Sequence, residues 1–355
     1  LYANSTVRIA PNDDKGATIT FDTGVAQGSA LSPLLFLIFM NALLGLLTAT
    51  GQELHISHGL VGRGKKVGRH SPVGRNDNEV VGQFNSIGFV DDLSLFAQSR
   101  GGAQALLNKI QEFEEWSGLK VNHKKTCVMI VGRDRKQSQG DLGLTYQGRE
   151  IKTLSPSTAC RYLGLWGTAD GDMTETKRRI FQKTKEARDM LEHHPLTPEQ
   201  AVELFGSVGV GAFRYTAALV PWTEGELRRL ESIWVQAYKR AWLLPLSTAS
   251  DIFTLPEGLE YPRPLGIMAQ ELCRHLQRCI KHDDVAKQIA QHDLDQALDQ
   301  WACSSLDDLQ QEMGLWEWNQ TLQTKWTRAA KCMQLLKMPF AWEPARLDEE
   351  TSMGT

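Results

Sequence analysis

Two neighbouring carboxylates, Asp91 and Asp92, lie between two short apolar runs of the sequence. The runs cover residues 86–90 and 93–97, and they predict a β-hairpin with both aspartates at its tip. Adjacent carboxylates repel each other, and a divalent cation relieves the repulsion because Mg²⁺ prefers oxygen ligands. A carboxylate pair that holds magnesium beside a triphosphate is suited to phosphoryl transfer with two metal ions. Taken alone, however, the pair is better explained as turn residues, since aspartate tolerates a left-handed backbone.

A glycine-flanked loop precedes this hairpin and leads into a helix. Residues 24–36 read GVAQGSALSPLLF, which predicts a helix with Ser32 as its N-cap and Pro33 at the first helical position. Gln27 and Gly28 therefore stand at a helix N-terminus, a suitable place to meet a phosphate or the edge of a templating base pair. The helix is apolar on every side, so we expect other elements to enclose it.

An amphipathic helix follows the hairpin at about residues 106–116. Its polar face is expected to carry Glu112, Glu114 and Glu115, and Gly118 is a suitable C-terminal glycine. The helix separates the aspartate pair from the next conspicuous block.

That block is basic and stands before an apolar run. Residues 118–126 read GLKVNHKKT and place Lys124 and Lys125 just ahead of residues 127–131, which we expect to form a buried strand. A second short strand is predicted at residues 161–165.

The order of these four blocks resembles that of reverse transcriptases, most closely those of non-LTR (LINE-type) retrotransposons. Residues 24–36 resemble the GxxQGxxLSPxLF block of that family, and residues 89–92 resemble its F/Y-x-D-D metal-binding hairpin. Residues 118–126 are similar to its GLxxNxxKT block, and residues 162–164 to its YLG primer-grip strand. One such block is weak evidence, whereas four in the same order support one another.

The resemblance implies a role for each matching residue. The catalytic residues would be Asp91, Asp92 and Lys125, with the two aspartates as ligands of two Mg²⁺ ions (or Mn²⁺) and the lysine near the triphosphate. The pocket for the template base and the incoming nucleotide would be formed by Gln27, Gly28, Ser32, Pro33 and Phe89. The primer end would be held by Tyr162, Leu163 and Gly164. The implied partners are an RNA template, a DNA primer and dNTPs.

The implied fold is α+β, with an antiparallel sheet and helices on one face of it. Residues 1–168 would be part of the palm of a right-hand polymerase, residues 169–245 a helical thumb, and residues 246–355 a helical extension. In the thumb, basic residues recur at helical spacing and could contact phosphates, although acids are interleaved with them. The basic residues are Lys177, Arg178, Arg179, Lys183, Lys185 and Arg188.

One feature of the family has no counterpart in the sequence. The first catalytic aspartate of the family lies upstream of the glutamine–glycine block, but Asp13 and Asp14 fall in a predicted turn and Asp22 lies almost on the loop. We therefore expect an N-terminally truncated fragment that lacks the fingers and the first catalytic strand. Because the remaining carboxylates hold two metal ions poorly, the chain alone is expected to have no polymerase activity, although its parent would.

Composition excludes several other classes of protein. The chain has 355 residues, with 41% hydrophobic and 23% charged residues and a net charge of −3, which indicates a folded protein of about two domains. Six cysteines are too few for a disulfide framework. No signal peptide is visible, and the longest apolar run, residues 34–47, is too short to span a bilayer. No membrane association is therefore expected.

The sequence leaves two alternatives open. One is a reverse transcriptase of the group II intron or retron type, against which the acidic composition of residues 283–312 argues. The other is a non-catalytic relic of a retroelement that acts at most as a nucleic-acid-binding module. Localisation and oligomeric state stay open, although an element that copies itself at chromosomal DNA has to reach the nucleus.

Overall fold

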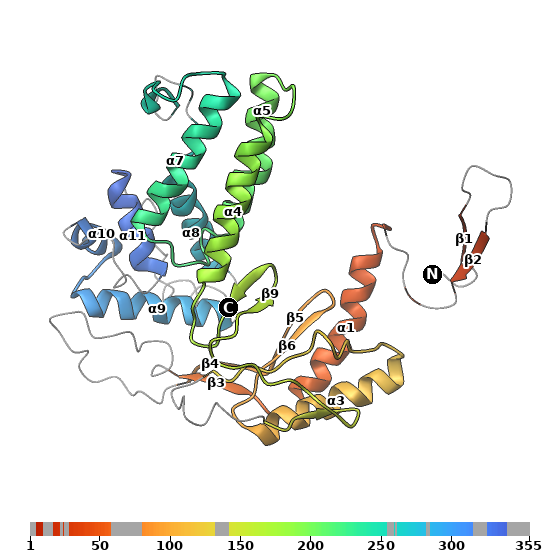
Figure 1. Cartoon of the computed structure of the whole chain (residues 1–355). Coiled ribbons are helices and arrows are strands. Elements are labelled where there is room, and N and C mark those ends of the chain that lie inside the picture. Colours follow the sequence, from red (N-terminus) through yellow and green to blue (C-terminus); the bar gives the residue numbers. More distant parts are fainter. Residues whose placement is uncertain are drawn as a thin grey trace, which may run out of the picture. The chain divides into compact units, whose positions relative to one another are not determined.

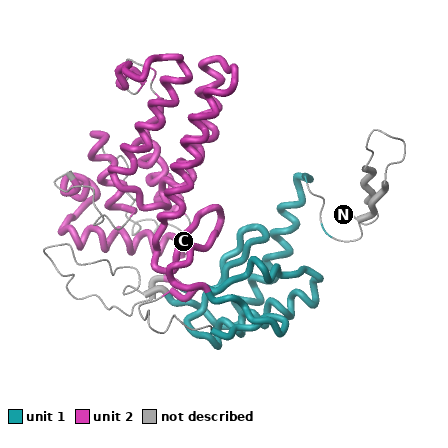
Figure 2. The backbone as a smooth tube through the Cα atoms, in the orientation of Figure 1, with its two compact units in different colours: residues 1–55, 83–128, 140–153 teal, residues 56–82, 129–139, 154–355 magenta. Residues whose placement is uncertain are grey.

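The computed structural model describes residues 5–9, 17–21, 24, 28–57, 80–131, 142–253, 259, 261–281, 285–314 and 325–338. The chain divides into two compact units (Figure 2). Unit 1 consists of residues 1–55, 83–128 and 140–153, and unit 2 consists of residues 56–82, 129–139 and 154–355. The candidate metal-binding hairpin lies in unit 1, and the expected primer-grip strand lies in unit 2.

Helices and small strand pairs make up the first half of the chain (Figure 1). The helices are α1 (Ser32–Thr48) and α3 (Arg100–Ser117). The strands are β1 (Ser5–Ile9), β2 (Ala17–Phe21), β3 (Leu54–Ser57), β4 (Val80–Phe84), β5 (Ser86–Phe89), β6 (Asp92–Leu95), β7 (Thr145–Tyr146) and β8 (Arg149–Glu150). Each strand pairs with its neighbour in the sequence, and β1–β2, β5–β6 and β7–β8 are antiparallel.

The core of unit 1 lies between α1 and α3. Leu43 and Leu47 of α1 and Leu106 of α3 are buried together there. As predicted, α3 is amphipathic and ends at Gly118, whose φ of 74° is left-handed and therefore suits glycine. At its start, the Ser99 hydroxyl accepts a hydrogen bond from the Gly102 amide at 3.0 Å.

Helix α1 differs from the expectation in two ways. Ser32 is its first residue rather than its N-cap, because Leu31 takes the cap position with a helical backbone and makes no side-chain cap hydrogen bond. The expectation that other elements enclose α1 is also wrong for the described residues. Core contacts cover only one side, and Leu37 and Ile38 are 50% and 64% exposed on another. An all-apolar helix predicts burial, but among the described residues the core covers α1 on one side only.

Unit 2 is mainly helical after one strand pair. The antiparallel strands are β9 (Cys160–Tyr162) and β10 (Leu165–Gly167). The helices are α4 (Thr174–Met190), α5 (Pro198–Phe205), a π-helical segment (Gly206–Val210), α6 (Gly211–Thr216), α7 (Glu224–Ala241), a 3₁₀ segment (Ser250–Phe253), α8 (Pro264–Lys281), α9 (Val285–Trp301), α10 (Leu306–Gly314) and α11 (Lys325–Leu335). The expected mixture of helices and strands is confirmed, but the described strands form separate two-stranded sheets.

A large aromatic and aliphatic core holds unit 2 together. Phe205, Phe213 and Trp234 are almost fully buried in it, and the Phe213 and Trp234 rings meet edge to face with centroids 5.6 Å apart. Thr197 and Gln200 form a capping box at the start of α5. A second capping box starts α7.

Two strands predicted from short apolar runs are wrong in detail. Residues 127–131 form only an isolated bridge, Val128 to Thr153, because they have no partner strand along their length. Residues 161–165 form a hairpin instead of one strand, with a turn at Leu163 and Gly164. The six cysteines, all among the described residues, form no disulfide bond. None of the described helices combines the length and the apolar character that crossing a bilayer requires.

Candidate active site

The hairpin β5–β6 places the aspartate pair at its end. Phe89 pairs with Asp92, so the two turn residues are Val90 and Asp91. The predicted hairpin is confirmed, but the turn lies one residue earlier than the sequence suggested, and Asp92 is the first residue of β6 rather than a turn residue. Both aspartates are exposed to solvent.

Val90 adopts an unusual backbone conformation in this turn. Its φ is 55°, whereas a β-branched residue strongly avoids the left-handed region. A positive φ at the first turn residue matches the geometry that closes a two-residue hairpin, and glycine is the usual residue there. The turn is therefore held in a strained conformation that costs about 1–3 kcal/mol. The strain lies directly beside Asp91.

The two carboxylates are chemically suited to a divalent cation. Within the described residues, neither the Asp91 nor the Asp92 side chain forms a hydrogen bond or an ion pair, so both can serve as ligands. No group of three or more His, Cys, Asp or Glu side chains in those residues is arranged to hold a metal ion. Two carboxylates without a closed protein cage fit Mg²⁺, which commonly binds one or two carboxylates together with water and substrate phosphates.

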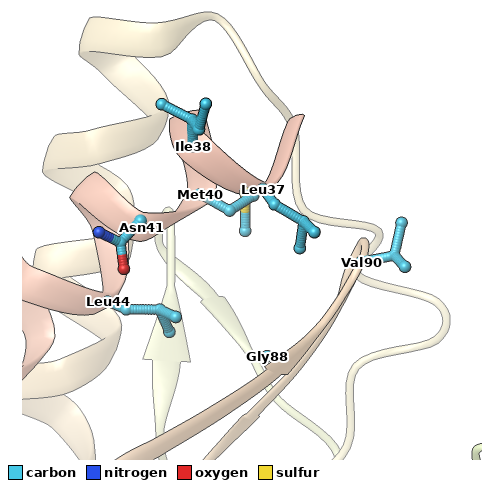
Figure 3. A pocket seen from close by; sticks show the side chains of 7 residues that line it. All are labelled: Leu37, Ile38, Met40, Asn41, Leu44, Gly88 and Val90. Atoms are coloured by element: carbon cyan, nitrogen blue, oxygen red, sulfur yellow. The ribbon is translucent and has the colours of Figure 1, made fainter. Parts of the chain in front are cut away.

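An apolar pocket of about 380 Å³ lies between α1 and the hairpin (Figure 3). Leu37, Met40 and Leu44 line it from α1, and Gly88 and Val90 line it from the hairpin. A Cβ at Gly88 would lie 3.7 Å from the Leu44 side chain, an ordinary van der Waals distance, so α1 and the hairpin lie close together at this point.

Lys125 lies on a compact turn in the same unit. The Lys124 amide donates to Asn122 Oδ1 at 3.1 Å, and the Lys125 amide donates to the Asn122 carbonyl at 3.0 Å. The Thr126 amide and hydroxyl both donate to that same carbonyl, at 3.1 Å and 3.0 Å. Asn122 therefore fixes the backbone on both sides of Lys125, and the lysine side chain itself is exposed.

The structure describes the other candidate residues of the nucleotide pocket only in part. Gln27 lies outside the described residues. Gly28 has a φ of 90° and is exposed, and Pro33 stands in the first turn of α1. The structure thus brings Phe89, Asp91 and Asp92 into one hairpin.

Comparison with known proteins settles the family. Residues 2–166 match the family described as "Reverse transcriptase (RNA-dependent DNA polymerase)". A Pol polyprotein from a type-2 retrotransposable element of Drosophila melanogaster is 31% identical over 227 residues, which is 63% of this chain and 19% of the relative. The matched segment is thus a reverse transcriptase segment similar to those of non-LTR retrotransposons. A Pol polyprotein from a type-1 retrotransposable element of Nasonia vitripennis is 27% identical over 264 residues, 72% of this chain and 22% of the relative. The chain therefore spans about a fifth of the length of these relatives.

The YLG block forms the turn of hairpin β9–β10. Leu163 and Gly164 have φ values of 45° and 85°, and the hydroxyl of Tyr215 donates a hydrogen bond to the Leu163 carbonyl. Tyr162 is 42% exposed at the end of β9. The block lies in unit 2.

One residue that supports the candidate site could not be recognised from the sequence. Glu114, expected on the polar face of α3, is buried, and it accepts hydrogen bonds from the Val121 amide, the Tyr146 hydroxyl and the Gln147 side chain. In the sequence, the one indication that Glu114 is buried was its position in the helix directly after Phe113, which is also buried. The partners that bury it come from a hairpin about thirty residues further on, which helical periodicity does not reveal.

Proposed function

We propose that the chain is the part of an RNA-directed DNA polymerase that carries the metal-binding hairpin. The observation that carries the proposal is the exposed carboxylate pair at the end of β5–β6, inside a segment that matches the reverse transcriptase family. The reaction is nucleotidyl transfer: the primer 3′ hydroxyl oxygen bonds to the α-phosphorus of a dNTP, the bond to the β-phosphate oxygen breaks, and pyrophosphate leaves.

Each candidate site residue would have a separate role in this reaction. Asp91 and Asp92 would hold Mg²⁺, which when bound supplies charge neutralisation and activates the hydroxyl. Lys125 would contact the triphosphate as a charge-assisted donor. The nucleotide and template base would be contacted by Gln27, Gly28, Ser32, Pro33 and Phe89. The primer end would be held by Tyr162, Leu163 and Gly164.

Three consecutive segments of the chain would be polymerase subdomains in this proposal. Residues 1–168 would be the palm, residues 169–245 the thumb and residues 246–355 a helical extension. The partners would be an RNA template, a DNA primer and dNTPs, and the biological role would be retrotransposition. This reading is preferred over a non-catalytic relic because the aspartate pair, the Lys125 turn and the YLG turn are all retained.

Metal binding at the hairpin tests the proposal without requiring turnover. The full chain is loaded with Fe²⁺ in place of Mg²⁺, in the presence of a dNTP and a template–primer, and treated with peroxide and ascorbate so that hydroxyl radicals cut the backbone near the metal. We expect cuts around residues 88–93 that disappear in Asp91→Asn and Asp92→Asn but persist in the matched control Asp251→Asn, an exposed acid of unit 2. Cuts that are unchanged in the hairpin variants would overturn the proposal.

Primer extension by the same chain is the second arm of the experiment. No extension by the chain alone is expected from its sequence, so addition of a dNTP to the primer would disprove that expectation. It would also support the polymerase proposal directly, provided that Asp91→Asn abolishes it. Extension that survives Asp91→Asn would show that the hairpin is not the catalytic metal site.

A further inference from the structure

The β7–β8 hairpin lies outside the four blocks that resemble family motifs, and the function proposed above gives it no role. It nevertheless contacts the turn that carries Lys125. The Tyr146 ring packs against the His123 ring, with centroids 5.2 Å apart and planes inclined by 53°. His123 stands two residues before Lys125, and the hairpin and the turn belong to the same unit.

The Tyr146 hydroxyl reaches the same turn by a second route. It donates a hydrogen bond to Glu114 Oε2, and Glu114 Oε1 accepts one from the Val121 amide at 2.9 Å. Tyr146 is 3% exposed, and its burial, followed by its hydrogen bond to Glu114, raises the pKa of the hydroxyl above its usual value. The hydroxyl therefore stays protonated and remains a donor. One side chain thus holds Val121 through a carboxylate and His123 through its ring.

The strand that carries Tyr146 is fixed to α3 by a single amide side chain. Gln104 Oε1 accepts a hydrogen bond from the Thr145 amide at 3.0 Å, and Gln104 Nε2 donates one to the Thr145 carbonyl at 2.8 Å. Both backbone groups of the residue before Tyr146 are therefore bound by the helix. Because α3 satisfies its own backbone hydrogen bonds, it gives the hairpin a stable support.

The turn of this hairpin adds a further contact to the same carboxylate. Gln147 and Gly148 form a two-residue turn with φ values of 50° and 71°, and positive φ at both residues suits the twist of a hairpin. A residue other than glycine is uncommon in this region. In this conformation Gln147 Nε2 donates to Glu114 Oε2 at 2.7 Å. The hairpin thus holds Glu114 with two neighbouring side chains.

The backbone just before Lys125 is held at two points. Val121 is bound through its amide, and His123 through its ring, since the buried His123 Nε2 has no hydrogen-bond partner among the described residues. Between them stands Asn122, whose carbonyl accepts hydrogen bonds from the amides of Lys125 and Thr126 at 3.0 Å and 3.1 Å. Holding both neighbours of Asn122 therefore fixes the carbonyl on which the lysine turn closes.

We propose that Tyr146 is a positioning residue that holds the Lys125 turn in place for the triphosphate. Its ring fixes His123, and its hydroxyl fixes Val121 through Glu114. The Lys125 side chain is exposed, so its direction depends on this backbone. A lysine that is already directed at its ligand loses less entropy on binding. The inference rests on the proposed contact between Lys125 and the triphosphate.

A double-mutant cycle in dNTP binding tests this role. The full chain is dialysed to equilibrium against a labelled dNTP with Mg²⁺ and a template–primer. We expect Tyr146→Phe to weaken binding about three- to tenfold, because it removes one hydrogen bond but keeps the ring. In a chain that already carries Lys125→Ala, Tyr146→Phe should change the affinity by less than about twofold. Equal effects with and without Lys125 would overturn the proposal, because Tyr146 would then act independently of the lysine.

His123 gives a second arm with a conservative variant. His123→Phe keeps an aromatic ring against Tyr146 and is expected to bind the dNTP within about twofold of the native chain. His123→Ala removes the ring contact and should weaken binding about threefold or more. Equal losses in the two variants would overturn the positioning by ring contact.

Tyr261→Phe provides the matched control. It removes a tyrosine hydroxyl of unit 2 that accepts a hydrogen bond from the Trp242 indole at 2.8 Å. Because it lies in the other unit, it should change dNTP binding by less than about twofold. Far-ultraviolet circular dichroism checks that each variant is folded.

Hydrogen exchange separates failure of the positioning from failure of the polymerase proposal. The amides of residues 121–126 should exchange faster in Tyr146→Phe than in the native chain or in Tyr261→Phe. Unchanged exchange would overturn the positioning. Faster exchange, together with dNTP binding that Lys125→Ala leaves unchanged, would instead overturn the triphosphate contact on which the inference rests.

Discussion

Glu114 Oε1 accepts a hydrogen bond from the backbone amide of Val121 at 2.9 Å, and this contact ties the end of α3 to the turn that carries Lys125. The other oxygen of the carboxylate accepts from Gln147 at 2.7 Å and from the Tyr146 hydroxyl. One buried acid therefore joins three segments of unit 1: a helix, the lysine turn and the β7–β8 hairpin. Its three donors compensate for the cost of burying it.

Replacing Glu114 by alanine is expected to destabilise unit 1. The substitution leaves the Val121 amide and the Tyr146 hydroxyl without their acceptor in a buried environment, which costs about 1–3 kcal/mol for an unpaired group. The free energy of unfolding, measured by urea denaturation, should therefore fall by about 1–3 kcal/mol or more. Glu115→Ala, an exposed neighbour in the same helix, is the matched control and should change it by less than about 0.5 kcal/mol.

Glu114→Gln separates the hydrogen bonds from the charge. The amide oxygen still accepts from Val121, so this variant should retain more stability than Glu114→Ala. Hydrogen exchange of the amides of residues 119–126 should quicken in the alanine variant more than in the glutamine variant. Unchanged exchange of the Val121 amide in Glu114→Ala would contradict the role assigned to this carboxylate.

Replacing Val90 by glycine is expected to increase the stability of unit 1 rather than to decrease it. Its positive φ costs about 1–3 kcal/mol, whereas glycine adopts this conformation freely and loses up to about 1 kcal/mol of chain entropy on folding. We therefore expect Val90→Gly to raise the free energy of unfolding by about 1 kcal/mol. Val131→Gly, at an exposed valine whose φ is not positive, should give no gain. A destabilised Val90→Gly would show that the valine side chain contributes more through the α1 pocket than the strain costs.

The turn at Val90 also shows what the sequence could predict and what it could not. Two apolar runs around a polar pair were sufficient to predict a hairpin at the correct residues. The exact turn was not predictable from local preferences, because aspartate suits a left-handed position and valine does not. The observed register places Gly88 against Leu44 of α1. Packing against α1 therefore accompanies this register, although the turn preferences of valine and aspartate disfavour it.

Apolar runs predicted secondary structure well only where the chain also provided partners. The amphipathic pattern and the glycine cap defined α3 because a helix satisfies its own backbone hydrogen bonds. Residues 127–131 are equally apolar but have only the Val128 bridge, since strands depend on a partner that the local sequence does not specify. The buried Glu114 has the same explanation, because its donors lie far away in the sequence.

Adjacent lysines allow a sharp test of the triphosphate contact. Lys124 and Lys125 are both exposed and lie on the same turn, but the family motif matches only Lys125. A charge-assisted hydrogen bond contributes about 1.5–3 kcal/mol, so Lys125→Ala should weaken dNTP binding about tenfold or more. Equilibrium dialysis with a labelled dNTP and a template–primer measures this, with Lys124→Ala expected to stay within about twofold. A larger loss in Lys124→Ala would move the contact to that residue.

Acidification is expected to weaken unit 2 through His275 of α8. Its Nε2 faces the Lys325 ammonium, and burial together with Lys325, Arg278 and Arg328 lowers its pKa from 6.5 to about 4. Between pH 6.5 and about pH 4, His275 is therefore mostly neutral in the folded chain and mostly protonated in the unfolded chain. The resulting stability is fully present above pH 6.5 and is lost as the pH falls through about 4.

His275→Gln isolates this contribution from other titrating groups. Burial raises the pKa of the neighbouring Asp293 to about 6, so that acid favours the folded chain as the pH falls, but it does so in both the native chain and the variant. The advantage in unfolding free energy of the native chain over His275→Gln should therefore shrink by about 1–2 kcal/mol between pH 7.5 and pH 4, after allowance for partial exposure. His193→Gln removes the same side chain from an exposed position and serves as the matched control. A His275→Gln difference that does not change with pH, or that changes no more than the control, would mean that Lys325 does not face the imidazole in solution.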